Sequence, residues 1–250
     1  MQVNGAVVRR GDALIQPSDR VDLGAPPPPP FPAALRKIHE DDDVLVIEKP
    51  AGLLTIATER ERERTAYRML TDYVAKQVVR GRPRRLFIVH RLDRETSGVL
   101  LFAKSGPAKG MLQEQFEARS AERRYVAIVE GRVGTPEGTL RSRLKTDRSL
   151  RIRSTRRRSE GKEAITHYRV LERRSNCTVL ELSLTTGRRG QIRAQLGELG
   201  HPIVGDLAYG ARTDPLRRVA LHATSLTLAT PVARRATFSS PVPPSFARVD

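Results

Sequence analysis

A run of prolines divides the chain more clearly than any other feature of the sequence. Residues 25 to 32 read APPPPPFP. Proline lacks a backbone N–H and has a fixed φ, so this run excludes a helix and favours an extended polyproline conformation. We therefore predict a semi-rigid linker over 25–33, with a small unit over 1–24 before it and one large domain over 34–250 after it.

The first unit contains short β-prone pieces separated by turn-forming residues at Asn4-Gly5 and at Pro17-Ser18-Asp19. This pattern predicts a small β appendage. The segment also resembles the tail of an S4 RNA-binding module over about twenty residues. A β appendage without RNA affinity explains the same residues, and both interpretations stay open.

The charge of the chain points to a polyanionic partner. Its 250 residues carry 45 Lys and Arg against 28 Asp and Glu, a formal net charge of +17. Clustered basic residues gain free energy by releasing the counterions condensed on phosphates. We therefore expect nucleic acid as the partner.

Several classes of protein are disfavoured by what the sequence lacks. The single cysteine, Cys177, cannot form an internal disulfide, and no apolar run is long enough to span a bilayer or to act as a signal peptide. The five histidines show no zinc spacing, and the run 41–43 of three aspartates is interpreted as a solvated turn. We expect a cytoplasmic protein, monomeric, with no membrane association and no metal.

One carboxylate stands in a polar turn between two apolar segments. Residues 90 to 98 read HRLDRETSG, with β-prone residues at 86–89 before them and at 99–103 after them. Asp93 is therefore placed on a loop between two strands, where the neighbouring arginines favour its ionised form. Turns between strands often contain Asp, Thr, Ser and Gly for backbone reasons alone, so composition by itself does not assign a function.

Two later blocks have the same character. Residues 123–131, RRYVAIVEG, alternate as a strand that carries Tyr125. Residues 186–193, TGRRGQIR, place a glycine turn before a short helix that carries Arg193. Because a helix dipole disfavours cations in the first turn, the arginines there indicate a required anionic partner.

A basic run lies between these two blocks. Residues 151–158 read RIRSTRRR and show no apolar periodicity after Ile152. We predict an exposed hairpin tip or flap whose Arg156, Arg157 and Arg158 bind RNA phosphates. An ordinary solvated loop is the alternative.

The three blocks together resemble the RluA-type RNA pseudouridine synthases. HRLD-x-x-TSG at 90–98, the basic-Tyr-x-Ala pattern at Tyr125 and the T-G-R-x-H-Q-I-R signature at 186–193 occur in the family's order. Gly190 stands where the family usually has His, and Thr55 occupies the place of another usual His after the 49–52 block KPAG. The resemblance covers roughly residues 35 to 240.

This resemblance implies an isomerase that converts uridine in ribosomal or transfer RNA to pseudouridine without a cofactor. It implies catalytic roles for Asp93, Tyr125 and Arg193, with Arg193 as the partner that keeps Asp93 charged. It also implies that Arg91 fills the gap left by a flipped base. The residues implied to contact RNA are Arg91, Arg188 and Gln191, besides the basic run.

The fold expected for the large domain is α+β, with a central mixed, mainly antiparallel sheet flanked by helices. Helices are predicted over 65–79, over 105–119 and directly after Gly190. A non-catalytic RNA-binding or ribosome-assembly protein that retains the fold is the alternative function. A methyltransferase is disfavoured because no glycine-rich cofactor loop is present.

Overall fold

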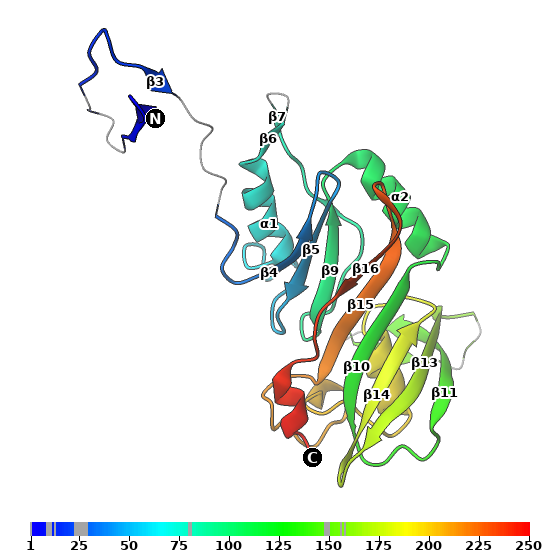
Figure 1. Ribbon diagram of the computed structural model, residues 1–250. Helices are drawn as coiled ribbons and strands as arrows, with labels where there is room; N and C mark the ends of the chain where they lie inside the picture. The colour runs from blue at the N-terminus through cyan, green and yellow to red at the C-terminus, as the bar shows by residue number, and fades with distance from the viewer. Residues whose placement is uncertain are drawn as a thin grey trace. The chain divides into compact units, whose positions relative to one another are not determined.

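The computed structural model describes residues 2–8, 12, 14–22, 30–79, 82–147, 151–155, 157 and 159–250. The chain divides into two compact units, Met1–Pro30 and Phe31–Asp250 (Figure 1). Residues 25–29 of the predicted linker lie outside the described residues. The linker therefore stays a prediction.

The first unit is a three-stranded antiparallel sheet. Its strands are β1 (Gln2–Val3), β2 (Ala6–Val7) and β3 (Val21–Asp22), in the order β2-β1-β3. The turn predicted at Asn4-Gly5 is confirmed, since both residues have positive φ, 51° and 83°. The Asn4 amide donates to Asp19 Oδ1 at 2.8 Å, which ties this turn to the second one. The resemblance to an S4 module remains a prediction.

The second unit is built on an 11-stranded sheet of order β12-β11-β13-β14-β10-β15-β9-β5-β4, to which β16 adds on β15 and β8 on β9 (Figure 1). Only the β9–β15 pair is parallel among these described pairings. The predicted α+β fold with a mixed, mainly antiparallel sheet is therefore confirmed. The strands are β4 (Arg36–Glu40), β5 (Val44–Lys49), β8 (Phe87–Ile88), β9 (Ser97–Ala103), β10 (Glu122–Glu130), β11 (Glu137–Thr146), β12 (Ile152–Ser154), β13 (Lys162–Arg173), β14 (Cys177–Leu184), β15 (Leu221–Thr230) and β16 (Ala233–Ser239).

All three predicted helices are present in the described residues, with shorter bounds in two cases. The helices are α1 (Ala66–Ala75), α2 (Gly106–Glu117) and α3 (Gln191–Glu198), and two 3-10 turns follow them in the chain, η1 (Leu207–Tyr209) and η2 (Pro244–Arg248). Thr65 and Ser105 cap the first two helices through their hydroxyls. Helix α1 ends before 79 because β6 (Val78–Val79) forms a hairpin with β7 (Arg82–Pro83).

Strands β5 and β9 are buried on both faces. Leu45 and Ile47 pack in one cluster with Leu70 of α1, whereas Val44 and Val46 pack in another with Leu112 of α2. Alternation along the strand sends neighbouring side chains to opposite faces, and each helix covers one of them. This explains why the sequence of β9 is a continuous apolar run rather than an alternating one.

The parallel contact between β9 and β15 depends on Gly98. Its φ is +114°, and a Cβ built there would lie 2.7 Å from Ala223 N and still closer to Ala223 O. No side chain fits between these two backbones. This close approach places the loop before β9 beside β15.

Gly98→Ala should therefore destabilise the protein by about 3 kcal/mol or more, because it adds both strain at positive φ and a backbone clash. Gly110→Ala in α2 is the matched control, since nothing lies within 4 Å of its Cβ position. That control should be neutral or stabilising by about 0.5–1 kcal/mol. Urea unfolding of both variants measures the difference, and equal midpoints would contradict the assigned contact.

Candidate active site

A cavity of about 500 Å³ opens between the loop before β9, the start of β10 and the segment that leads into α3. It contains Asp93, the aspartate of the first sequence block. Its lining comes from residues 89–93 and Thr96, from the end of α2, from Arg123 and Tyr125, from 184–189, from 191–193 and from Leu221. Segments separated by about 100 residues in the sequence thus meet at one site.

The Asp93 loop is anchored by Lys49 at the end of β5. The buried ammonium of Lys49 donates to the carbonyls of Pro50, Leu53 and Arg94 at 2.9, 2.7 and 3.1 Å. Burial lowers the pKa of Lys49 to about 7, although the nearby Glu95 and Asp93 charges raise it in part. This side chain ties the end of β5 to the loop.

Thr55 provides a second anchor for the same loop. Its hydroxyl donates to the Leu92 carbonyl at 2.8 Å and accepts from the Leu92 N–H at 3.2 Å. The sequence assigned no role to this threonine, which stands in place of a usual histidine. A threonine after the KPAG segment gave no signal of this contact, because its partner lies 37 residues away.

His90 supports the loop from its other end. Its Nε2 accepts the Leu101 N–H at 3.0 Å, and its ring stacks on Phe116 with 4.9 Å between centroids. Burial first, and the charge of Arg123 second, lower the pKa of His90 to about 3. A neutral imidazole is therefore required by the folded state.

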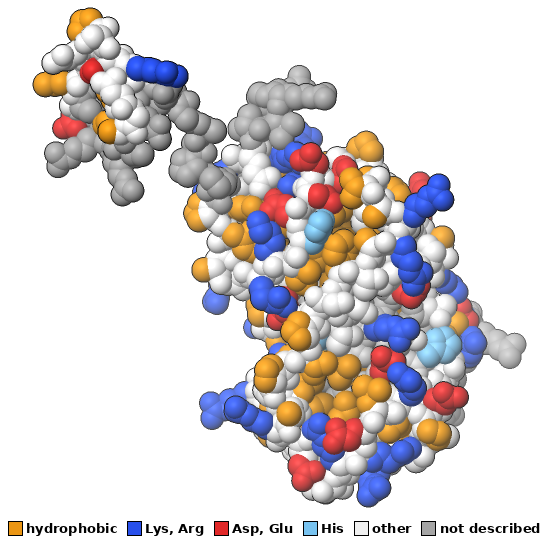
Figure 2. Space-filling view, viewed as in Figure 1, with side chains coloured by type: hydrophobic (Ala, Val, Ile, Leu, Met, Phe, Trp, Pro, Cys, Tyr) orange, Lys and Arg blue, Asp and Glu red, His pale blue; other side chains and the backbone are white. Residues whose placement is uncertain are grey.

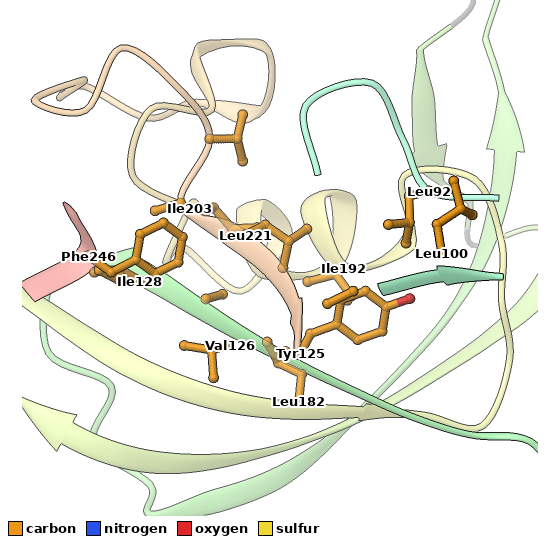
Figure 3. Packing of buried hydrophobic residues seen from close by; sticks show 14 of the residues in the cluster. Leu92, Leu100, Tyr125, Val126, Ile128, Leu182, Ile192, Ile203, Leu221 and Phe246 are labelled. Carbon is orange, nitrogen blue, oxygen red and sulfur yellow. The ribbon is translucent and has the colours of Figure 1, made fainter. Parts of the chain in front are cut away.

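Tyr125 enters the cavity from β10. The residue is buried and lies in the main hydrophobic cluster with Leu92, Leu182 and Ile192 (Figure 3). Burial raises the pKa of Tyr125 to about 12, against a lowering effect of Arg123 and with a smaller raising effect of Asp93. The phenol is therefore protonated at neutral pH.

Asp93 receives its hydrogen bond from the backbone. The Gly190 N–H donates to Asp93 Oδ2 at 3.0 Å. Gly190 precedes α3 and has φ +59°, a conformation that L-residues rarely adopt. A Cβ there would lie 2.9 Å from Tyr209 Oη, so in this chain the tyrosine hydroxyl sits beside the position where the family usually has a histidine side chain.

Arg193 does not form the contact that the sequence analysis predicted. Its guanidinium makes a bidentate ion pair with Asp206, at 2.6 and 2.7 Å, and lies over the Tyr209 ring at 4.9 Å. Burial lowers the pKa of Arg193, but Asp206 chiefly, and Asp93 more weakly, outweigh this and hold the pKa above its usual value. Arg193 thus has Asp206 as its direct partner and acts on Asp93 only through space. Asp206 lies 13 residues further along the chain, which no local pattern links to Arg193.

Gln191 is also placed differently from its predicted role as an RNA contact. Its amide is buried and bonded within the protein, to the Thr186 hydroxyl, the Arg188 N–H, the Ile165 carbonyl and the Thr166 hydroxyl. This network holds the segment 186–191 in shape. Contact with RNA through this amide would break hydrogen bonds that the fold already uses.

Comparison with known proteins now identifies the family. The family described as RNA pseudouridylate synthase matches residues 43–198. An RNA pseudouridine synthase of Bacillus subtilis, YhcT, is 35% identical over 92% of this chain and 75% of its own length. The ribosomal large subunit pseudouridine synthase D of Haemophilus ducreyi is 33% identical over 93% of this chain and 76% of its own.

The chain belongs to the RluA-type RNA pseudouridine synthases. It is accordingly an isomerase that acts on uridine in RNA. The fold agrees, since the human RNA pseudouridylate synthase domain-containing protein 1 superposes with a TM-score of 0.68, covering 83% of each chain at 24% identity. The family and enzyme class predicted from the sequence are confirmed.

The remaining predicted RNA contacts of this synthase are distributed unevenly. Arg91 is exposed and lines the cavity, as does Arg188, whose Nε donates to the Glu163 carbonyl at 3.1 Å. Arg157 is exposed near the β12–β13 connection, outside the cavity, and pairs with Glu160 at 3.0 Å. Arg156 and Arg158 lie outside the described residues.

No helix in the described part of the chain is long and apolar enough to cross a membrane.

His90 makes the stability of the synthase depend on pH. Its folded pKa of about 3 lies below the unfolded value of about 6.5, so the unfolded chain binds the extra proton. The free energy of unfolding therefore falls as pH drops from about 6.5 towards 3. Between pH 6.5 and 5 the loss from this group is about 2 kcal/mol.

His90→Gln should lower stability at pH 7 but flatten the dependence of unfolding free energy on pH between 5 and 7. Exposed His167 gives the control variant, His167→Gln. Urea unfolding at several pH values is the measurement. A slope as steep in His90→Gln as in the unmodified protein would show that this imidazole is not the group that titrates.

Proposed function

We propose that this synthase isomerises a specific uridine of ribosomal or transfer RNA, with large-subunit ribosomal RNA as the first candidate, and that Asp93 is its essential carboxylate. The observation that carries the proposal is the cavity that joins Asp93, Tyr125 and Arg193. The choice of RNA rests on relatives named as ribosomal large subunit pseudouridine synthase D.

The reaction moves one bond within a nucleotide. The N-glycosidic bond from C1′ to N1 breaks, the uracil turns, and C5 joins C1′, so neither an oxidant nor a group donor is consumed. Asp93 either attacks the sugar or stabilises the positive charge that develops on it. Both roles need the Asp93 carboxylate held beside the sugar, and the Gly190 N–H, which donates to Oδ2 at 3.0 Å, supports that position.

Tyr125 stacks on the uracil in this proposal, and its hydroxyl assists proton transfer at the sugar or at C5. Its burial in the cavity beside the Asp93 loop supports both roles. A protonated phenol donates a hydrogen bond at neutral pH, as the raised pKa of Tyr125 requires.

The target base leaves its stack to enter the cavity, at a cost of a few kcal/mol. Arg91 is proposed to fill the gap that the base leaves, since it is exposed at the mouth of the cavity. Arg188 is proposed to contact the backbone phosphates there. The volume of about 500 Å³ accommodates one nucleotide.

A non-catalytic RNA-binding or assembly protein would keep the same fold. Such a protein needs basic side chains at its surface but does not need a carboxylate, a buried tyrosine and a paired arginine around one cavity. The arrangement of Asp93, Tyr125 and Arg193 therefore favours the enzyme over this alternative.

Asp93→Asn should abolish pseudouridine formation, with at least a thousandfold lower rate, while folding and RNA affinity change little. The substitution removes one charge and keeps the shape of the side chain. Tritium release from ribosomal and transfer RNA labelled at uridine C5 is the measurement.

Asp72→Asn is the matched control, since Asp72 is an exposed carboxylate on α1 that forms an ion pair with Arg68 at 3.4 Å. It should retain full activity. Asp93→Asn with a rate within tenfold of the control would exclude an essential carboxylate at this position. An unmodified protein inactive on both RNA pools would instead count against the proposed substrates.

RNA affinity should depend steeply on salt. Basic side chains are spread over the face seen in Figure 2, among acidic ones, and the formal net charge of the whole chain is +17. Replacing Arg156, Arg157 and Arg158 by Ser should weaken all RNAs about equally and reduce the slope of log affinity against log salt by about 2–3. The modified position should not move.

The control is the pair Arg234→Ser and Arg235→Ser on β16, which does not line the cavity. Salt titrations on cognate and scrambled stem-loops measure both variants. An unchanged slope in the triple variant, or a loss confined to the cognate RNA, would show that this run is not a general phosphate clamp.

A further inference from the structure

Arg123 is a buried cation on the same strand as Tyr125. The two residues are separated by one position on β10, so their side chains leave the strand on the same side, and both line the cavity. Arg123 is only 8% exposed. Its neighbour Arg124 is exposed and pairs with Glu181 at 3.3 Å.

The guanidinium of Arg123 has more N–H donors than the surrounding protein offers acceptors. Its Nη2 donates to the Leu184 and Thr185 carbonyls, at 3.1 and 3.3 Å. Its Nε is buried with no hydrogen-bond partner, the one such side-chain atom in the part of the chain that the structure describes. No carboxylate among the described residues forms an ion pair with it, in contrast to Arg193 with Asp206.

The surroundings of Arg123 are arranged to hold this cation in place. Its Cζ lies 5.6 Å from the centre of the Phe116 ring. A Cβ at Gly187 would lie 2.5 Å from Nη1, so the glycine of the T-G-R block leaves the space that the guanidinium occupies. Burial lowers the pKa of Arg123, against a raising effect of Tyr125, yet an arginine keeps its charge at neutral pH.

A desolvated cation without an anion is costly for a folded protein, and it persists where a bound partner supplies the negative charge. We propose that Arg123 donates a hydrogen bond to a carbonyl oxygen of the flipped uracil and stabilises the anion formed when the glycosidic bond breaks. This inference rests on the proposed function and adds a group that binds the reacting base.

The electron balance of the step explains why a cation is useful there. When the bond from C1′ to N1 breaks, its electron pair stays with the uracil and spreads onto O2 and O4. After the base turns, C5 bonds to C1′, the C5 proton leaves and N1 takes up a proton. A preorganised donor in a water-excluded site acts on the charge that develops in between.

The depth of Arg123 favours the base over a phosphate as its ligand. Phosphates stay near solvent, where exposed Arg188 of the cavity lining can meet them. Arg123 is buried as Tyr125 is, and its charge lowers the pKa of the phenol, although burial outweighs this effect. A planar, weakly hydrated guanidinium at this level suits the edge of a flat base.

The test compares Arg123→Met with Arg124→Met, its exposed neighbour on the same strand. The probe is a synthetic stem-loop with one uridine that the unmodified protein converts. Versions of it carry 2-thiouridine or 4-thiouridine at the target, or a neutral methylphosphonate at the target's 5′ phosphate. Single-turnover rates, RNA affinities and urea unfolding midpoints are measured for each protein.

Arg123→Met should lower the single-turnover rate 100- to 1,000-fold while changing RNA affinity less than threefold. Arg124→Met should change neither. One thio substitution should slow the unmodified protein at least tenfold and Arg123→Met less than threefold, because sulfur is a poor acceptor for a donor that the variant lacks. The methylphosphonate effect should be equal in both proteins.

A rate for Arg123→Met within threefold of Arg124→Met would overturn the inference. The inference would also be overturned if each thio substitution slowed Arg123→Met as much as it slows the unmodified protein. If only the methylphosphonate effect differed between the two proteins, Arg123 would be assigned to a phosphate. If Arg123→Met does not fold, Arg123→Lys is compared with Arg124→Met in the same way. Thio substitutions that slow Arg123→Lys as much as they slow the unmodified protein would also overturn the inference. Failure of the unmodified protein to convert any uridine would instead count against the proposed function.

Discussion

The geometry of the active site depends on the hydrogen bonds that the buried ammonium of Lys49 donates. A cation in the interior is stable only when its donors are satisfied, and the carbonyls of residues 50, 53 and 94 satisfy this one. Together with Thr55 at the Leu92 backbone, it fixes the loop that carries Asp93. At the start of α3, the Gly190 N–H donates a hydrogen bond to Asp93 of this loop.

The charges around the cavity are balanced in different ways. The charge of Arg193 is balanced by an ion pair with Asp206 inside the protein. Arg193 therefore lines the cavity as a fixed residue and interacts with Asp93 electrostatically through space. Arg123 has no such carboxylate in the described residues, and its partial satisfaction by two carbonyls leaves capacity for a ligand. A cavity that brings the Asp93 carboxylate and the buried Arg123 cation together suits a reaction in which opposite charges develop on sugar and base.

Local patterns predicted the elements well where one periodicity was clear. The helix capped by Ser105 and the strand carrying Tyr125 are present in the structure, because capping chemistry and side-chain alternation act over a few residues. Helix α1 was predicted too long, since Val78 and Val79 pair with β7 instead of extending the helix. The partners of Arg193, Thr55 and Arg123 were not predictable, as each depends on contacts between distant segments.

The sequence alone determined the family, the α+β class and the residues that carry chemical groups, because motifs in a fixed order can be recognised without knowing how they are arranged in space. Only the tertiary structure decided which of these groups face the cavity and which support it. Gln191 and His90 belong to signature blocks, yet their polar atoms are consumed by internal hydrogen bonds. The physical reason is that burial removes water as a partner, so each polar group must find its partner wherever the fold brings one.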